Sequence, residues 1–166
     1  MEDDHSIAAK LDHAIELLKK LEADGPRSNR TAEKFWALEG LRERLDDPSG
    51  DVMLVGAVSL PTGETYDWQQ SASTEALLEN NWAERIEPVR ALGHPVRLSL
   101  LQAVLKGQRA TAELAAIQGV GTTGQLHHHL RMLVSAGWLQ AAGRGHYEVP
   151  ATRVIPLLAV MTAAAP

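Results

Sequence analysis

The stretch TAELAAIQGVGTTGQLHHHLRMLVSAGW, residues 111–138, decides the fold that we expect for the second half of the chain. It holds two short helical patterns joined by a glycine-containing turn, and the second pattern runs from about 122 to 135. Thr122 or Thr123 supplies the N-cap of that helix, and Gly137 ends it. The apolar residues that predict its buried side recur at helical spacing: Leu126, Leu130 and Leu133 or Val134. This arrangement predicts a helix-turn-helix.

The flanking residues complete a larger unit. Upstream, His94-Pro95 begins a helix, because proline is favoured in a first helical turn, and Gly107 ends it. Downstream, residues 138–141 and 146–149 have strand character on either side of Gly143-Arg144-Gly145. This second part predicts a hairpin, called a wing, with an arginine at its tip. A helix-turn-helix followed by such a hairpin is a winged helix.

Charge separates the two halves of the chain. The protein has 166 residues and a net charge of −5. Residues 1–89 contain 9 Lys and Arg against 19 Asp and Glu, a balance of −10, whereas residues 90–166 contain 7 against 2, a balance of +5. A phosphate backbone responds to the local field within about a Debye length (~8 Å at physiological salt). The second half is therefore the candidate nucleic-acid surface.

The rest of the chain predicts a mainly helical segment with one β-hairpin. We expect helices over about 6–23, 31–46 and 73–92, and hairpin strands over 52–60 and 65–69 joined by the turn 61–64. An apolar helix follows at about 154–165. The predicted class is α+β, mainly α with β-hairpins. The expected domains are an acidic segment at 1–89, with its hairpin at about 52–70, for dimerisation or sensing, a winged helix at 90–150, and a dimerisation helix at 151–166.

Four short motifs in order resemble the ArsR-type winged-helix transcriptional regulators over roughly residues 90–150. They are Ala91-Leu92-Gly93-His94-Pro95-Val96-Arg97, Glu113-Leu114-Ala115, His129-Leu130-Arg131-Met132-Leu133 and Ala136-Gly137-Trp138-Leu139. The resemblance implies a homodimeric repressor that reads a partly palindromic operator in double-stranded DNA. It implies a recognition helix at about 122–135 and an Arg-tipped wing at 143–146. The DNA-binding residues expected are Thr122, Thr123, Gln125, His127, His128, Arg131 and Arg144.

Three single motifs suggest more specific sites, but each has less support than the winged helix. Successive helical residues point about 100° apart, so His127, His128 and His129 do not converge on one metal ion. The resemblance to the ArsR-type regulators, which have a packed histidine at the position of His129, implies that His129 packs in the core. The sequence Gly119-Val120-Gly121-Thr122-Thr123-Gly124 matches a dinucleotide fingerprint, but no strand precedes it. Tyr66, Trp68 and Trp82 form a candidate effector pocket, although packing under the hairpin explains them as well.

The residue composition excludes several kinds of site and several classes of protein. The chain has no cysteine, which rules out disulfides and thiolate sites, and it has no enzyme signature, so we expect neither catalysis nor a metal or other cofactor. An apolar run too short to cross a bilayer and an acidic N-terminus predict a cytoplasmic protein without a membrane partner. The alternative function is a winged helix that binds protein, since the recognition helix lacks lysine. A small-molecule or protein effector remains open.

Overall fold

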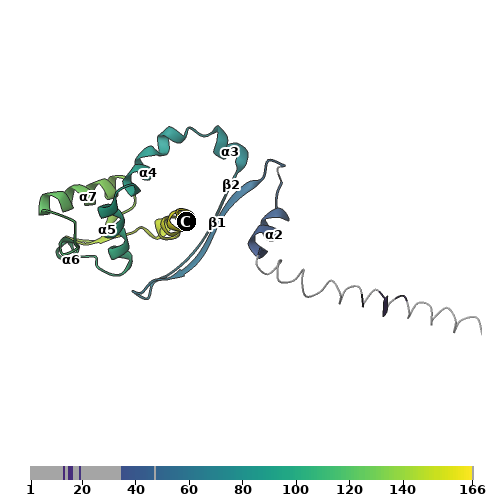
Figure 1. The fold of residues 1–166 in the computed structure, drawn as a ribbon, viewed down its shortest axis with the longest axis horizontal. Coiled ribbons are helices and arrows are strands. Elements are labelled where there is room, and N and C mark those ends of the chain that lie inside the picture. Colours follow the sequence, from purple (N-terminus) through teal and green to yellow (C-terminus); the bar gives the residue numbers. More distant parts are fainter. Residues whose placement is uncertain (1–12, 14, 17–18, 20–34, 47, 166) are drawn as a thin grey trace, which may run out of the picture. The chain divides into compact units, whose positions relative to one another are not determined.

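The computed structural model describes residues 13, 15–16, 19, 35–46 and 48–165. The chain divides into two compact units, Met1–Pro48 and Ser49–Pro166, which are treated separately. The boundary expected near residue 89 falls inside the second unit, because the hairpin before it packs on the last helix (Figure 1).

The first unit contains helix α2 (Trp36–Arg42). The helix expected over 6–23 lies outside the described residues except at His13, Ile15, Glu16 and Lys19. The expected cap of the next helix, Thr31, also lies outside them. Helix α2 is shorter than the predicted range of 31–46.

The second unit begins with a long antiparallel hairpin, as predicted. Strands β1 (Asp51–Ser59) and β2 (Thr65–Ser73) pair along their whole length, and the second strand extends four residues beyond its predicted end. Gly56 pairs with Trp68 and faces helix α8 (Ala151–Ala163), where an added Cβ would lie 2.7 Å from a methyl group of Ile155. Paired residues share a face of the hairpin, so Trp68 lies on the face toward α8.

The prediction of one continuous helix over 73–92 is wrong. The structure has helix α3 (Thr74–Glu79), the 3-10 helix η1 (Trp82–Arg85) and helix α4 (Ile86–Leu92). The break falls at Asn80 and Asn81, where the Asn80 amide donates to the Ala76 carbonyl and the Asn81 side chain accepts from the Ala83 N–H, 3.1 Å away. Asparagine side chains compete with helical backbone bonds in this way and favour helix ends.

The helix-turn-helix forms the core of the second unit. It consists of α5 (Pro95–Leu105), α6 (Thr111–Ala115) and α7 (Thr123–Ser135), followed by the short strands β3 (Gln140–Ala141) and β4 (Tyr147–Glu148). The observed fold is therefore mixed α+β, as predicted. The large apolar side chains that are almost fully buried come from these three helices, from the segment before β3 and from helix α8: Leu100, Leu101, Val104, Leu114, Leu126, Leu130, Leu133, Leu139 and Val154.

Helix α8 joins the core to the hairpin. It starts at Ala151, the first residue of the helix expected at 151–166, and packs against β1 and β2 (Figure 1). Val154, Ile155 and Leu157 are buried within the unit, whereas Val160 and Met161 are exposed. Much of the apolar side of α8 is thus covered by its own chain. No helix within the described residues is long and apolar enough to cross a membrane.

Candidate nucleic-acid interface

Helix α7 presents one polar side because its other side is buried. Leu126, Leu130 and Leu133 are at most 1% exposed, which confirms the first of the two predicted registers, since Val134 is 40% exposed. Six of the seven residues expected to contact DNA lie at exposed positions on or beside this helix: Thr122, Thr123, Gln125, His127, His128 and Arg131. The fold therefore gives α7 the polar face that a recognition helix needs.

Two of these residues also cap the helix. The Gln125 N–H donates to the Thr122 hydroxyl at 3.3 Å, and the Thr122 N–H donates to the Gln125 side-chain oxygen at 2.7 Å. This reciprocal pair is a capping box, which satisfies two backbone donors at the helix start. The Gln125 side-chain oxygen is engaged in the cap, whereas Thr123, His127, His128 and Arg131 are exposed and take no part in it.

The wing places Arg144 at an exposed tip. Gly143 and Gly145 on either side of it have φ values of 128° and 72°, which L side chains rarely adopt. The base of the wing is held by residues 109–111: the Tyr147 N–H donates to the Arg109 carbonyl at 2.9 Å, and the Thr111 N–H donates to the Gly145 carbonyl at 2.8 Å.

Thr111 does not cap the helix that it begins. The N-cap position belongs to Ala110, whose N–H donates to the Glu113 carboxylate at 2.8 Å, while the Thr111 hydroxyl donates to the Gly145 carbonyl. The Thr111 hydroxyl therefore stabilises the wing and not the start of α6.

Much of the basic excess in residues 90–166 is used inside the fold. Arg97 is buried and donates to the Ala91 and Arg90 carbonyls, and Arg153 lies over the Trp138 ring with its guanidinium carbon 5.0 Å from the ring centroid. Arg109 pairs with Glu64 at 2.5 Å. Arg131 on α7 and Arg144 on the wing are exposed cations. A net charge count therefore overstates the number of cations that are available to phosphates.

The three consecutive histidines differ in burial. His127 and His128 are exposed, whereas His129 is half-buried with its ring centroid 4.7 Å from that of His94, the N-cap of α5. Burial lowers the pKa of His129, and nearby His94, Arg97 and His128 lower it further. No group of three or more metal-ligating side chains occurs among the described residues.

The candidate effector residues lie in two settings. Tyr66 and Trp68 are half-buried on β2, and Tyr66 packs against the core. Trp82 is 66% exposed on η1, in a depression that is lined by Leu77, Arg85, Ile86 and Val89. This depression does not include Tyr66 or Trp68.

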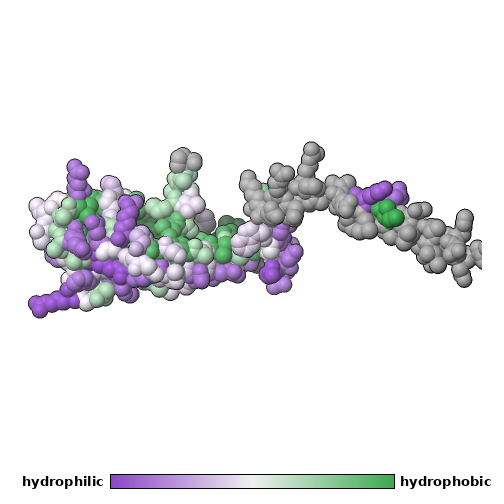
Figure 2. Space-filling view, turned by 90° about the horizontal axis from the view of Figure 1, so that it is seen from below, coloured by the Kyte–Doolittle hydropathy of each residue, from purple (hydrophilic) through white to green (hydrophobic). Residues whose placement is uncertain are grey.

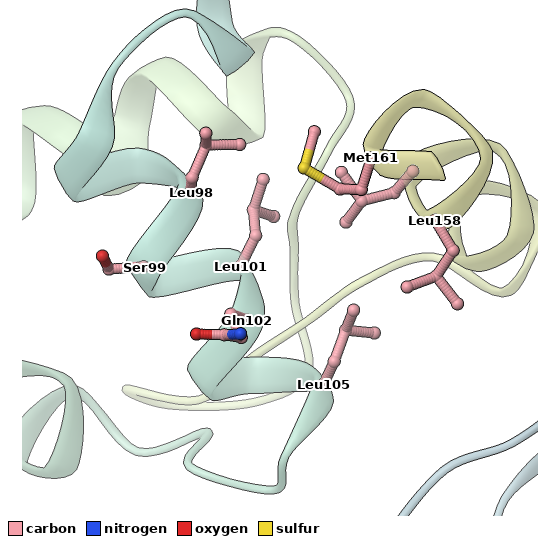
Figure 3. Close-up of a pocket in the computed structure, with 8 residues that line it drawn as sticks. Leu98, Ser99, Leu101, Gln102, Leu105, Leu158 and Met161 are labelled. Carbon is pink, nitrogen blue, oxygen red and sulfur yellow. The ribbon is translucent and has the colours of Figure 1, made fainter. Parts of the chain in front are cut away.

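A groove that the sequence did not indicate runs between α5 and α8. Figure 3 shows Leu98, Leu101 and Leu105 of α5 directed toward Leu158 and Met161 of α8. The groove has a volume of about 330 Å³, and Ser99 and Gln102 are its polar lining residues. Figure 2 shows hydrophobic surface gathered toward the middle of this unit, with hydrophilic residues at the end formed by the helix-turn-helix. Periodicity reveals an apolar helix face but not a gap between two such faces.

The chain is similar over part of its length to a curated protein. No model of a known protein family matches the chain. A probable mercury resistance operon repressor of Streptomyces lividans is 38% identical over 72 residues, which are 42% of this chain and 57% of the repressor. The match thus spans little more than half of that relative's length.

Proposed function

We propose that this protein is a transcriptional regulator that binds double-stranded DNA through α7 and the wing. The observation that carries the proposal is the arrangement of the second unit: a capped helix with a polar exposed side, followed by a hairpin whose exposed tip is an arginine. An α-helix fits the major groove, and an arginine on a wing suits a phosphate or the minor groove. The partial similarity to a repressor supports the same class.

In this proposal the exposed residues have different roles. Arg131 and Arg144 bind phosphates, and Arg144 extends the contact beyond the groove that holds α7. Thr123, His127 and His128 reach base edges, while Thr122 and Gln125 fix the start of the helix through the capping box. The regulator is a repressor in this proposal, as the name of the relative suggests.

We further propose that the regulator acts as a homodimer on a partly palindromic operator. The segment from α3 to α4 exposes a row of large apolar side chains: Leu78, Trp82, Ile86 and Val89, each between 55% and 68% exposed. We call this row the apolar arc. A second copy would cover it, since exposed apolar patches rimmed by polar residues are typical of protein interfaces.

The dimer is tested by light scattering on the purified chain. The wild type should have twice the monomer mass, and Ile86→Glu should reduce it to the monomer mass. Glu84→Gln, a change beside the arc that leaves its apolar side chains in place, is the control and should remain dimeric. A monomeric wild type would contradict this part of the proposal.

Selection of bound fragments from the source genome tests DNA binding and names the target. The wild type should enrich a small set of fragments that share an inverted repeat. The Arg131→Ala/Arg144→Ala variant, which changes two exposed side chains, should enrich none while remaining folded. Equal, sequence-independent recovery by both proteins would favour the alternative in which the winged helix binds protein.

A further inference from the structure

The turn of the long hairpin touches the segment that holds the wing. The turn follows β1, and its Glu64 carboxylate accepts from the Arg109 guanidinium at 2.5 Å and, on the same oxygen, from the Thr62 hydroxyl at 2.8 Å. Figure 1 shows this end of the hairpin reaching the side of the helix-turn-helix. A Cβ added to Gly107 would lie 3.0 Å from the Thr62 methyl group, so the two loops are in close contact.

Residues 109–111 act as a third strand beside the wing. Their backbone bonds to Tyr147 and Gly145 at 2.8–2.9 Å, and Ala110 forms an isolated antiparallel bridge with His146. Strands β3 and β4 have two residues each, which is too short to fix the direction of a hairpin by themselves. The position of Arg144 therefore depends on where residues 109–111 are held.

The ion pair between Glu64 and Arg109 is suited to hold residues 109–111 in place. The side chains of Arg109 and Glu64 are 28% and 38% exposed, less than those of the pair Arg90–Glu87, which are 72% and 63% exposed with a separation of 4.0 Å. The hydrogen bond from Arg109, and then that from Thr62, lowers the pKa of the Glu64 carboxyl, and the bond to Glu64 raises the pKa of Arg109. Both groups are thus charged at neutral pH.

We propose that Glu64 and Arg109 are positioning residues for the wing, whose ion pair fixes residues 109–111 and thereby places Arg144 against the DNA backbone. This inference rests on the proposed function. Under it, the hairpin is part of the DNA-binding device although it lies before the winged helix in the sequence. Arg109 affects DNA binding because its pair with Glu64 fixes residues 109–111, and it does not itself contact a phosphate.

The decisive variant is Glu64→Gln, because two explanations predict opposite signs. Removal of an acidic charge should strengthen binding to a polyanion if charge alone matters, or if Arg109 is freed to contact a phosphate. Loss of positioning should instead weaken binding, by about three- to fivefold for a partly exposed pair. Fluorescence anisotropy on a labelled genomic fragment measures the difference, with Glu87→Gln as the control of equal charge change at the more exposed pair.

A second arm separates positioning from a general loss of structure. In the Arg144→Ala background the wing tip no longer contributes, so Glu64→Gln should weaken binding no further. The charge-swapped variant Glu64→Arg/Arg109→Glu should recover most of the lost affinity. Unchanged or tighter binding by Glu64→Gln, or an equal loss in both backgrounds, would overturn the inference.

The inference can fail independently of the proposed function. Binding by the wild type that depends on Arg144 supports the function, whatever Glu64→Gln does. If the wild type does not bind DNA, amide hydrogen exchange still tests the clamp: exchange at Gly145–Glu148 should be faster in Glu64→Gln than in Glu87→Gln. Equal exchange in the two variants would overturn the proposed positioning role.

Discussion

The helix-turn-helix and the segment from β1 to α4 use similar apolar residues but bury them differently. In the helix-turn-helix, most leucines of α5, α6 and α7 meet in one core and are almost fully buried, and only Leu98 and Leu105 of α5 are half-buried at its edge. In the earlier segment, one face of the hairpin packs on α8, whereas the apolar arc stays exposed. The first region therefore buries most of its apolar side chains within one chain, whereas the second leaves a row of them exposed to solvent.

The largest expected effect tests the completeness of the helix-turn-helix. Leu130→Ala removes a side chain that is 1% exposed and should lower the free energy of unfolding by about 2–5 kcal/mol. Val55→Ala, at a position of the hairpin that is 44% exposed, should cost well under half as much. Urea denaturation measures both variants, and equal losses would remove the distinction between the two regions.

A somewhat smaller effect tests how the hairpin is attached. Gly56→Val forces atoms into the space that is occupied by Ile155, which is 3% exposed, and overpacking of this kind typically costs about 1–3 kcal/mol. Thermal unfolding measures the effect. Ala57→Val, which adds the same kind of bulk to the opposite face of β1, is the control and should change the melting temperature less. An unchanged melting temperature for Gly56→Val would show that α8 does not pack closely on β1.

The third effect separates helix capping from the proposed DNA contact on α7. Thr122→Ala removes the N-cap of α7 and should cost about 1 kcal/mol of stability. Thr123→Ala, one residue later and outside the cap, should leave stability unchanged and reduce DNA affinity. If Thr123→Ala destabilises the protein as much as Thr122→Ala does, the assignment of the cap is wrong.

The smallest effect concerns pH. The pKa of His129 is lowered in the folded protein, mainly by burial, so the unfolded chain binds more protons than the folded chain as the pH falls below about 6.5. Stability should therefore decrease between about pH 7 and pH 5, and less steeply in His129→Leu. Parallel curves of melting temperature against pH would contradict the burial of this imidazole.

Local signals explain why the second half of the chain was predictable. Pro95, Gly107, Thr122 and Gly137 mark helix ends, and the leucine spacing of α7 selects its buried side. The break at Asn80 was not predicted, because the apolar spacing of residues 77–86 continues through it. The ion pair between Glu64 and Arg109, which are 45 positions apart, depends on tertiary contact and has no local signal.

The salt dependence of DNA binding tests the central claim most directly. Titrations of the wild type at two salt concentrations should give an affinity that falls as salt rises, with the slope reduced by about one in Arg144→Ala, since each phosphate contact contributes ~0.9. Addition of Arg131→Ala should abolish measurable binding. The absence of binding at low salt by a folded wild-type protein, or a slope that the double variant leaves unchanged, would contradict an interface formed by α7 and the wing.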